Sequence, residues 1–234
     1  RQPFDVRVLP TRFPRLASDP PGPARGRMTG TLEARGDLIA LLDHDDLMLP
    51  SHLRLTEAAL LAHPGMSLCF GDAVEFDEQA GREWSLFRNK SIEAAAFAEV
   101  EPSGLRLVTE PLLPSLIPGS YIPTAANLWR RDAALQIGGF HAAMGSCDDL
   151  LFFLCLSRVG SVGYFPFPLA RKRVHASNLS HDRNAVQSAL NAYVSYRFVA
   201  SEPIRWNLTA SEHALLDARA WSEVWSEDAG WVTF

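Results

Sequence analysis

Lysine is scarce in this chain, since Lys90 and Lys172 are the only two lysines among 22 basic residues. Arginine makes fixed, bidentate contacts with phosphate and carboxylate groups, but a GC-rich genome would produce the same bias and is the simpler interpretation. The 27 acidic residues outnumber the basic ones and give a formal net charge of −5. This charge argues against a nucleic-acid partner that is held by neutralising phosphates.

Cysteine is also rare, and long apolar runs are missing. Cys69, Cys147 and Cys155 lack the spacing of a metal site, so free thiols in a reducing compartment are expected. No run reaches the roughly 18 apolar residues that span a membrane, and no signal peptide is visible. A cytoplasmic location is predicted, and peripheral association with the inner face of a membrane is compatible with it. Because the chain begins with Arg1 rather than Met, we expect it to be a fragment of a longer protein.

The order of the predicted elements indicates an α/β fold. The 234 residues are 47% hydrophobic, enough for one domain with a sizeable core. Residues 38–42 and 66–76 are apolar runs without alternation, which predict strands buried on both faces. Helices are predicted from about Pro50 to residue 62 and over 148–159. Strands that alternate with helices favour a mostly parallel sheet flanked by helices.

The remaining predicted elements are less strongly patterned. Strands are predicted over 4–9, 125–129 and 162–174. Short helices are predicted over 27–35 and from residue 132 to the glycine pair at 138–139, with a helical patch over 92–99 in an irregular segment. Amphipathic helices are predicted over 182–200 and 210–226. Thr209 and Glu212 have the spacing of a capping box. The sequence thus predicts a main domain over 1–181 and a helical extension over 182–234.

Three carboxylates, Asp43, Asp45 and Asp46, follow the predicted strand over 38–42. In open α/β sheets this end of a strand is where ligands bind. Crowded carboxylates repel one another unless a cation lies among them, and a divalent ion held by one or two carboxylates and by substrate phosphates fits this arrangement. The alternative is a solvated acidic turn with an N-cap aspartate.

Two further groups of residues are candidates for a functional site, and a single carboxylate, Asp72, lies within the predicted strand over 66–76. Asp148 and Asp149 open a strongly apolar helix after a glycine-rich turn; they could simply cap the helix, or one could act as a general base. His175 lies in a basic stretch over 171–178 that suits contact with a diphosphate or a metal. A basic surface patch is the alternative there.

Taken in order, these motifs resemble the family 2 glycosyltransferases of the GT-A fold. The motifs are LLDHDDLMLP, FGDAVEFDEQAG, NLWRRDAALQIGGF, CDDLLFFLCLSRVG and RKRVHASNLS, within residues 24–181. The resemblance implies inverting transfer of a sugar from a nucleotide-sugar donor to a hydroxyl of a saccharide or lipid-linked acceptor, in bacterial cell-surface polysaccharide synthesis. The family's first strand, with a P-x-Y-N-like turn, has no counterpart, and residues 4–9 resemble its third strand.

The resemblance also implies roles for single residues and a cofactor, Mg²⁺ or Mn²⁺. It assigns Asp43, Arg27 and Arg173 to binding of the donor. It assigns Asp45 and His175 to the metal, and it makes Asp149 the catalytic base with Asp148 as its neighbour. This division suits the chemistry, because a metal neutralises the charge of the leaving diphosphate and a carboxylate accepts the proton of the attacking hydroxyl.

Two other interpretations of the sequence are open. The first is a non-catalytic relative that keeps the fold as a binding or scaffolding domain, which the missing first strand favours. The second is a phosphotransferase with Asp43 as the nucleophile, since such enzymes also place two spaced aspartates after a buried strand. That chemistry needs a lysine near the phosphate, and neither Lys90 nor Lys172 has a suitable context.

Overall fold

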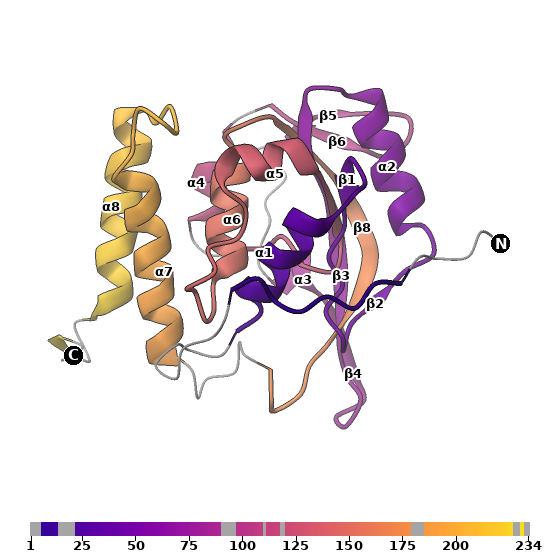
Figure 1. The fold of residues 1–234 in the computed structure, drawn as a ribbon, viewed down its shortest axis with the longest axis horizontal. Helices are drawn as coiled ribbons and strands as arrows, with labels where there is room; N and C mark the ends of the chain where they lie inside the picture. Colours follow the sequence, from indigo (N-terminus) through magenta and orange to yellow (C-terminus); the bar gives the residue numbers. More distant parts are fainter. Residues whose placement is uncertain are drawn as a thin grey trace.

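A curved mixed sheet forms the centre of the molecule, with helices on both of its faces (Figure 1). The computed structural model describes residues 6–13, 22–89, 97–109, 111–117, 120–178, 185–226 and 230–231. Helix α2 (His52–Ala62) covers one face, and α5 (Arg131–Ile137) and α6 (Asp148–Leu156) cover the other. Helices α7 (Ala185–Ala200) and α8 (Ala210–Val224) pack together beyond α6.

Two long strands, β3 (Met66–Asp77) and β8 (Ser161–Arg173), run in parallel through the middle of the sheet. The strand order is β1-β7-β3-β8-β6-β5, while β2 pairs with β8 and β4 pairs with β3. The bounds of these shorter strands are β1 Leu38–Ile39, β2 Leu47–Met48, β4 Arg82–Ser85, β5 Phe97–Val100, β6 Arg106–Val108 and β7 Asn127–Arg130. A separate antiparallel pair joins β9 (Trp225–Ser226) to β10 (Gly230–Trp231).

The predicted α/β class is confirmed, but the sheet is not mostly parallel. Within the described residues, every strand pair except β3–β8 is antiparallel. The cause lies in the connections. Strands β3 and β4 are joined by a tight turn, which permits only antiparallel pairing, whereas a parallel pair needs a crossover of a dozen or more residues.

The core consists of one apolar layer on each face of the sheet. On the side of α5 and α6, Trp129 and Phe152 are buried, and the Phe140 ring stacks on Phe152 with centroids 4.0 Å apart. On the side of α2, Leu60 and Leu169 are fully buried in a smaller layer. Strand β3 lies between the layers, which explains its continuous apolar run.

Most of the predicted helices are confirmed. Helices α2, α5, α6, α7 and α8 lie where the sequence places them, and α5 ends at Gly138, whose φ of 94° favours glycine. At the start of α8 the Thr209 backbone N–H donates to Glu212 Oε2 at 2.8 Å, and the Glu212 N–H donates to Thr209 Oγ1 at 3.2 Å. The capping box is therefore formed. Helix α1 (Ala24–Glu33) begins earlier than predicted and ends before Gly36.

Three sequence-based predictions about strands and helices were wrong. The run over 38–42 is not a strand buried on both faces: β1 has two residues, lies at a sheet edge, and is followed by Leu42 with 51% of its surface exposed. Residues 6–9 form no strand, and Val8 is 94% exposed. Residues 97–99 belong to β5 rather than to a helix.

Each of these errors has the same physical origin, because apolar pattern alone does not show which neighbour a segment has.

Residues 4–5, 92–96 and 179–184, the last including the predicted domain boundary, lie outside the described residues. Short helices α3 (Leu86–Asn89) and α4 (Leu113–Leu116) complete the described elements. Across the described part of the chain, the helices lack the length and apolarity that crossing a membrane requires.

Candidate functional site

Arg27 connects the two acidic clusters that the sequence singles out. It lies in α1, and its Nη2 donates to Asp43 Oδ1 and Oδ2 at 3.0 and 2.8 Å. Its Nη1 donates to Asp148 Oδ1 and Oδ2 at 3.1 and 3.0 Å. Asp43 follows β1 and Asp148 is the first residue of α6. One planar guanidinium therefore holds two carboxylates from distant parts of the chain, a geometry for which arginine is suited.

This cluster is largely shielded from water. The side chains of Arg27 and Asp148 are 9% and 3% exposed, and the Arg27 guanidinium lies 5.9 Å from the centroid of the Phe140 ring. Burial acts to lower the pKa of Arg27, but the carboxylates of Asp148 and Asp43 outweigh it and raise that pKa above its ordinary value. Arg27 is thus a permanently charged group.

Asp148 has a strongly perturbed pKa. Burial raises the pKa of its carboxyl to about 6; the charge of Arg27 opposes this rise and the charge of Asp149 adds to it. Desolvation disfavours the ionised form, and a neighbouring carboxylate acts in the same direction. Asp148 is therefore a buried carboxyl that is held in place by Arg27, rather than a group that faces a ligand.

Asp149 differs from its neighbour in exposure. Its side chain is half-buried, and its Oδ1 accepts the backbone N–H of Leu150 at 2.9 Å. The chain enters α6 through Cys147, whose φ of 56° is left-handed and unfavourable for a residue with a side chain. The turn thus orients the two carboxylates differently, so that Asp148 meets Arg27 while Asp149 stays accessible.

Asp43 is partly open to solvent, in contrast to Asp148. Its side chain is 34% exposed, and its Oδ2 also accepts a hydrogen bond from Thr124 Oγ1 at 3.1 Å. Thr124 could not be recognised from the sequence, because no motif surrounds it. The carboxylate is thus fixed by two partners while one side remains open to a ligand.

Asp45 and His175, a second pair of predicted site residues, contact each other, and Asp45 lies two residues after Asp43. His175 Nε2 lies 3.0 Å from Asp45 Oδ2, and Ser177 Oγ lies 2.7 Å from His175 Nδ1. Partial burial acts to raise the pKa of Asp45, but the hydrogen bond with His175, a backbone hydrogen bond and the nearby imidazoles of His44 and His175 together lower that pKa below its ordinary value. Asp45 therefore stays ionised at neutral pH.

Arg173 and Asp46 connect the loop of Asp45 to β8. The Arg173 backbone N–H donates to Asp46 Oδ1 at 3.0 Å, and Arg173 Nε donates to the Asp45 carbonyl at 3.2 Å. Asp46 is buried, and burial together with the charges of Asp45 and Asp43 raises its pKa. These contacts make Asp46 a structural residue of the loop.

Asp72, the remaining carboxylate that the sequence singled out, accepts hydrogen bonds from the β3–β4 hairpin and from the start of α3. Its Oδ1 accepts the backbone N–H groups of Ala73 and Phe87 at 2.7 and 2.9 Å, and its Oδ2 accepts the hydroxyl of Ser85 at 2.6 Å. The side chain is 3% exposed. Asp72 therefore stabilises the fold and is separate from the acidic clusters.

Asp45 and His175 suit a divalent ion as two of its ligands. His175 Nε2 lies 3.0 Å from Asp45 Oδ2, near enough for both atoms to bind one ion, and a carboxylate oxygen suits Mg²⁺ or Mn²⁺. The described residues contain no group of three or more His, Cys, Asp or Glu side chains that could hold a metal. Such an ion would need further oxygen ligands from a substrate.

No protein-family model and no curated protein matches the chain. Among solved structures, Staphylococcus aureus TarS (residues 1–349) in complex with UDP-GlcNAc is similar with a TM-score of 0.61 and 16% identity, over 89% of this chain and 54% of the solved chain. A second TarS structure gives a TM-score of 0.55 and 15% identity, over 86% and 51%. The fold is GT-A-like. The chain spans about half the length of these solved chains.

The structure brings the predicted site residues into two adjacent groups. One contains Arg27, Asp43 and Asp148 with Asp149 beside them, and the other contains Asp45, His175 and Arg173. Besides Thr124, Phe140 beneath Arg27 had no role predicted from the sequence. A possible signal for Phe140 was its place directly after the two glycines that end α5. Ser177 was part of the basic stretch but had no assigned role.

Proposed function

We propose that this chain is an inverting, metal-assisted glycosyltransferase of the family 2 type, with a nucleotide-diphosphate sugar as donor. One observation carries the proposal: Arg27 holds Asp43 and Asp148 together, which places the accessible Asp149 in the same cluster as the loop of Asp45. A candidate proton acceptor and a candidate diphosphate site would thereby be neighbours. The GT-A-like fold and the UDP-GlcNAc bound to TarS support a nucleotide-sugar donor.

The donor would lie between the two groups. Asp43 has its exposed side available for the nucleoside part of the donor, and the guanidinium of Arg27 fixes that carboxylate. Asp45 and His175 would hold Mg²⁺ or Mn²⁺, which neutralises charge on the leaving diphosphate when bound. Arg173 contributes positive charge beside the same loop. Each of these side chains is held by a second contact, as a preorganised site requires.

Asp149 would act as the general base. Its carboxylate accepts the proton of an acceptor hydroxyl, whose oxygen forms a bond to the anomeric carbon as the bond from that carbon to the diphosphate oxygen breaks. Attack on the face opposite the leaving group inverts the anomeric configuration. Asp148 is an unsuitable base in comparison, because it is buried against Arg27. The acceptor would be a saccharide or a lipid-linked saccharide, as in bacterial cell-surface polysaccharide synthesis.

A donor screen with UDP-sugars and Mn²⁺ tests this proposal, with release of UDP and formation of a glycoside as the two readouts. Asp149→Asn keeps the shape of the side chain and removes the base, so transfer is expected to fall by about 10²–10⁴-fold, while UDP binding is unchanged. Glu57→Asn, on the exposed side of α2, is the control and should transfer like the wild type. Transfer by Asp149→Asn at the wild-type rate would remove Asp149 from this role, and donor binding without any transfer would indicate a binding domain.

A further inference from the structure

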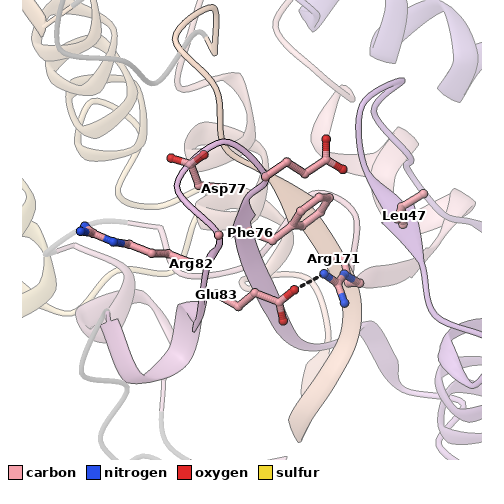
Figure 2. Close-up of a pocket in the computed structure, with 8 residues that line it drawn as sticks. Leu47, Phe76, Asp77, Arg82, Glu83 and Arg171 are labelled. Carbon is pink, nitrogen blue, oxygen red and sulfur yellow. Dashed lines mark hydrogen bonds and ion pairs between the residues drawn. The ribbon is translucent and has the colours of Figure 1, made fainter.

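A groove lies outside the two groups of site residues, where β2, β3, β4 and β8 adjoin (Figure 2). Its volume is about 460 Å³, within the range of about 300–1,000 Å³ typical of small-molecule sites. The lining residues that matter here are Leu47, Phe76, Asp77, Glu78, Glu83 and Arg171. They come from four strands and one turn, so the groove is built by the sheet rather than by a loose loop.

The strand register explains why these side chains share one face. Phe76 in β3 pairs with Glu83 in β4, and Leu47 in β2 pairs with Arg171 in β8. Residues directly opposite each other on neighbouring strands point to the same face of a sheet. Figure 2 shows the Phe76 ring beside the Arg171–Glu83 ion pair, with Leu47 across from them. The exposed half of Leu47 adds apolar surface to the groove.

The charged groups at the groove, with Arg173 beside it, contact one another and the Phe76 ring. The guanidinium groups of Arg171 and Arg173 lie 4.7 and 4.8 Å from the centroid of the Phe76 ring. Arg171 pairs with Glu83, and Arg173 pairs with Glu78. Cation–π contacts and ion pairs thus orient two planar guanidinium groups and two carboxylates. The groove presents an ordered array of hydrogen-bond donors and acceptors.

This array selects among classes of ligand. An anion is disfavoured, because the lining carries three carboxylates, Asp77, Glu78 and Glu83, against two guanidinium groups, Arg82 and Arg171. A purely apolar ligand is disfavoured by the charged walls, whose desolvation would go uncompensated. A neutral ligand rich in hydroxyl groups satisfies both donors and acceptors, and its C–H groups can pack against Leu47.

Arg173 connects the groove to the proposed reaction site. Its guanidinium contacts Phe76 and Glu78 at the groove and, through Nε, the carbonyl of Asp45 at 3.2 Å. A molecule in the groove therefore lies beside the loop that carries Asp45, on the far side of Arg173. An extended substrate could occupy the groove while one of its ends reaches that loop.

We propose that the groove binds a neutral saccharide portion of the acceptor. That the bound saccharide is an acceptor rests on the proposed function, but the binding of neutral saccharides to the groove can be measured by itself. Glu83 and Arg171 would recognise adjacent hydroxyl groups, and Leu47 would contact the C–H face of a sugar ring. The groove would therefore determine which acceptor is used, and it would take no part in the chemical step.

The test is a titration of the full chain with neutral disaccharides (maltose, cellobiose and N,N′-diacetylchitobiose), followed by the backbone amide NMR signals of Gly81 and Glu83. At least one disaccharide is expected to shift these signals in a saturable way, and inorganic phosphate is expected to leave them unchanged. Glu83→Gln should weaken saccharide binding by roughly tenfold, since it replaces a charged acceptor by a neutral one. Glu57→Gln, on the exposed side of α2, is the matched control and should bind like the wild type.

Three results would overturn the inference: no disaccharide shifts the signals, phosphate shifts them in place of the sugars, or Glu83→Gln binds as the wild type does. UDP with Mn²⁺ is titrated into the same samples to separate this inference from the proposed function. Saccharide binding without UDP binding would refute the nucleotide-sugar transferase and leave the groove as a saccharide site. UDP binding without saccharide binding would refute the groove alone.

Discussion

The Arg27 cluster and the Asp45–His175 pair are built from the same short loop, yet the partners of the two loop carboxylates differ in exposure. Asp43 leads into a cluster in which Arg27 and Asp148 are 9% and 3% exposed. Asp45, two residues later, meets His175 where the two side chains are 20% and 32% exposed. Asp43 itself is 34% exposed, so the buried Arg27 and Asp148 fix the geometry of the first group, while Asp43 and the second group are open to a ligand.

The cost of ionisation differs between the two regions in the same sense. Burial raises the pKa of Asp148 to about 6 despite the charge of Arg27, whereas at Asp45 the hydrogen bond with His175, a backbone hydrogen bond and the nearby imidazoles together overcome partial burial and lower the pKa. A carboxylate that must bind a cation has to be ionised at neutral pH, and Asp45 meets this condition more readily. Substitutions in the two regions should therefore affect different properties.

The largest effect on stability is expected for Arg27→Ala. This change leaves the buried Asp148 and the partly buried Asp43 without their shared counter-charge, and breaking a buried ion pair costs about 3–5 kcal/mol. Urea unfolding measures the loss. Arg54→Ala, at an exposed position of α2, is the control and should change stability by less than about 0.5 kcal/mol. An equal, small effect of both substitutions would show that the cluster is not a stabilising unit.

The pH dependence of stability is the second way to separate the regions. Because the pKa of Asp148 is raised from 3.8 to about 6, the folded state binds this proton more tightly than the unfolded state does. Its contribution to stability is complete below the ordinary pKa and is lost as the pH rises through the folded-state value. Between about pH 4 and pH 7, the free energy of unfolding of the wild type should fall by on the order of 2 kcal/mol more than that of Asp148→Asn.

The same urea unfolding experiment, repeated at each pH for both proteins, checks this difference. The comparison with Asp148→Asn removes the contributions of the other carboxyl groups, which the two proteins share. Parallel pH profiles would mean that Asp148 is ionised as easily in the folded state as in the unfolded chain, and the contrast between the two regions would disappear.

A smaller effect is expected for Thr124→Val, which removes the hydroxyl that donates to Asp43 with little change in shape. The loss of one hydrogen bond to a partly exposed carboxylate should lower the free energy of unfolding by about 0.5–1.5 kcal/mol. It should also weaken UDP binding, since Asp43 would keep Arg27 as its one remaining described partner. Unchanged UDP affinity would show that Asp43 is positioned by Arg27 alone.

The sequence predicted the elements whose signals are local. Strand β3 has a continuous apolar run, α5 ends at Gly138, and the pair Thr209 and Glu212 forms its capping box. The two-residue strand β1 could not be recognised in this way, because its burial depends on lying at a sheet edge beside β7. The antiparallel pairs were missed for a similar reason, since pairing direction depends on connections between neighbours.

The sequence indicated the residues of the candidate site but not the contacts among them. The motifs indicated the acidic residues and His175, and the resemblance implied roles for Arg27 and Arg173. The bridge from Arg27 to Asp148 joins residues 121 positions apart, so no spacing rule predicts it. That Asp148 is buried while Asp149 is accessible depends on the turn at Cys147. The roles of base, donor contact and metal ligand remain predictions for these residues.

The most direct measurement is the thermal shift that UDP produces in the presence and absence of Mn²⁺, compared between wild type and Asp45→Ala. Asp45 is partly exposed, so its loss should change stability itself by no more than about 1 kcal/mol. We expect UDP to raise the melting temperature of wild type only with Mn²⁺, and to leave Asp45→Ala unchanged under both conditions. An equal Mn²⁺-dependent shift in the two proteins would contradict the proposed metal site.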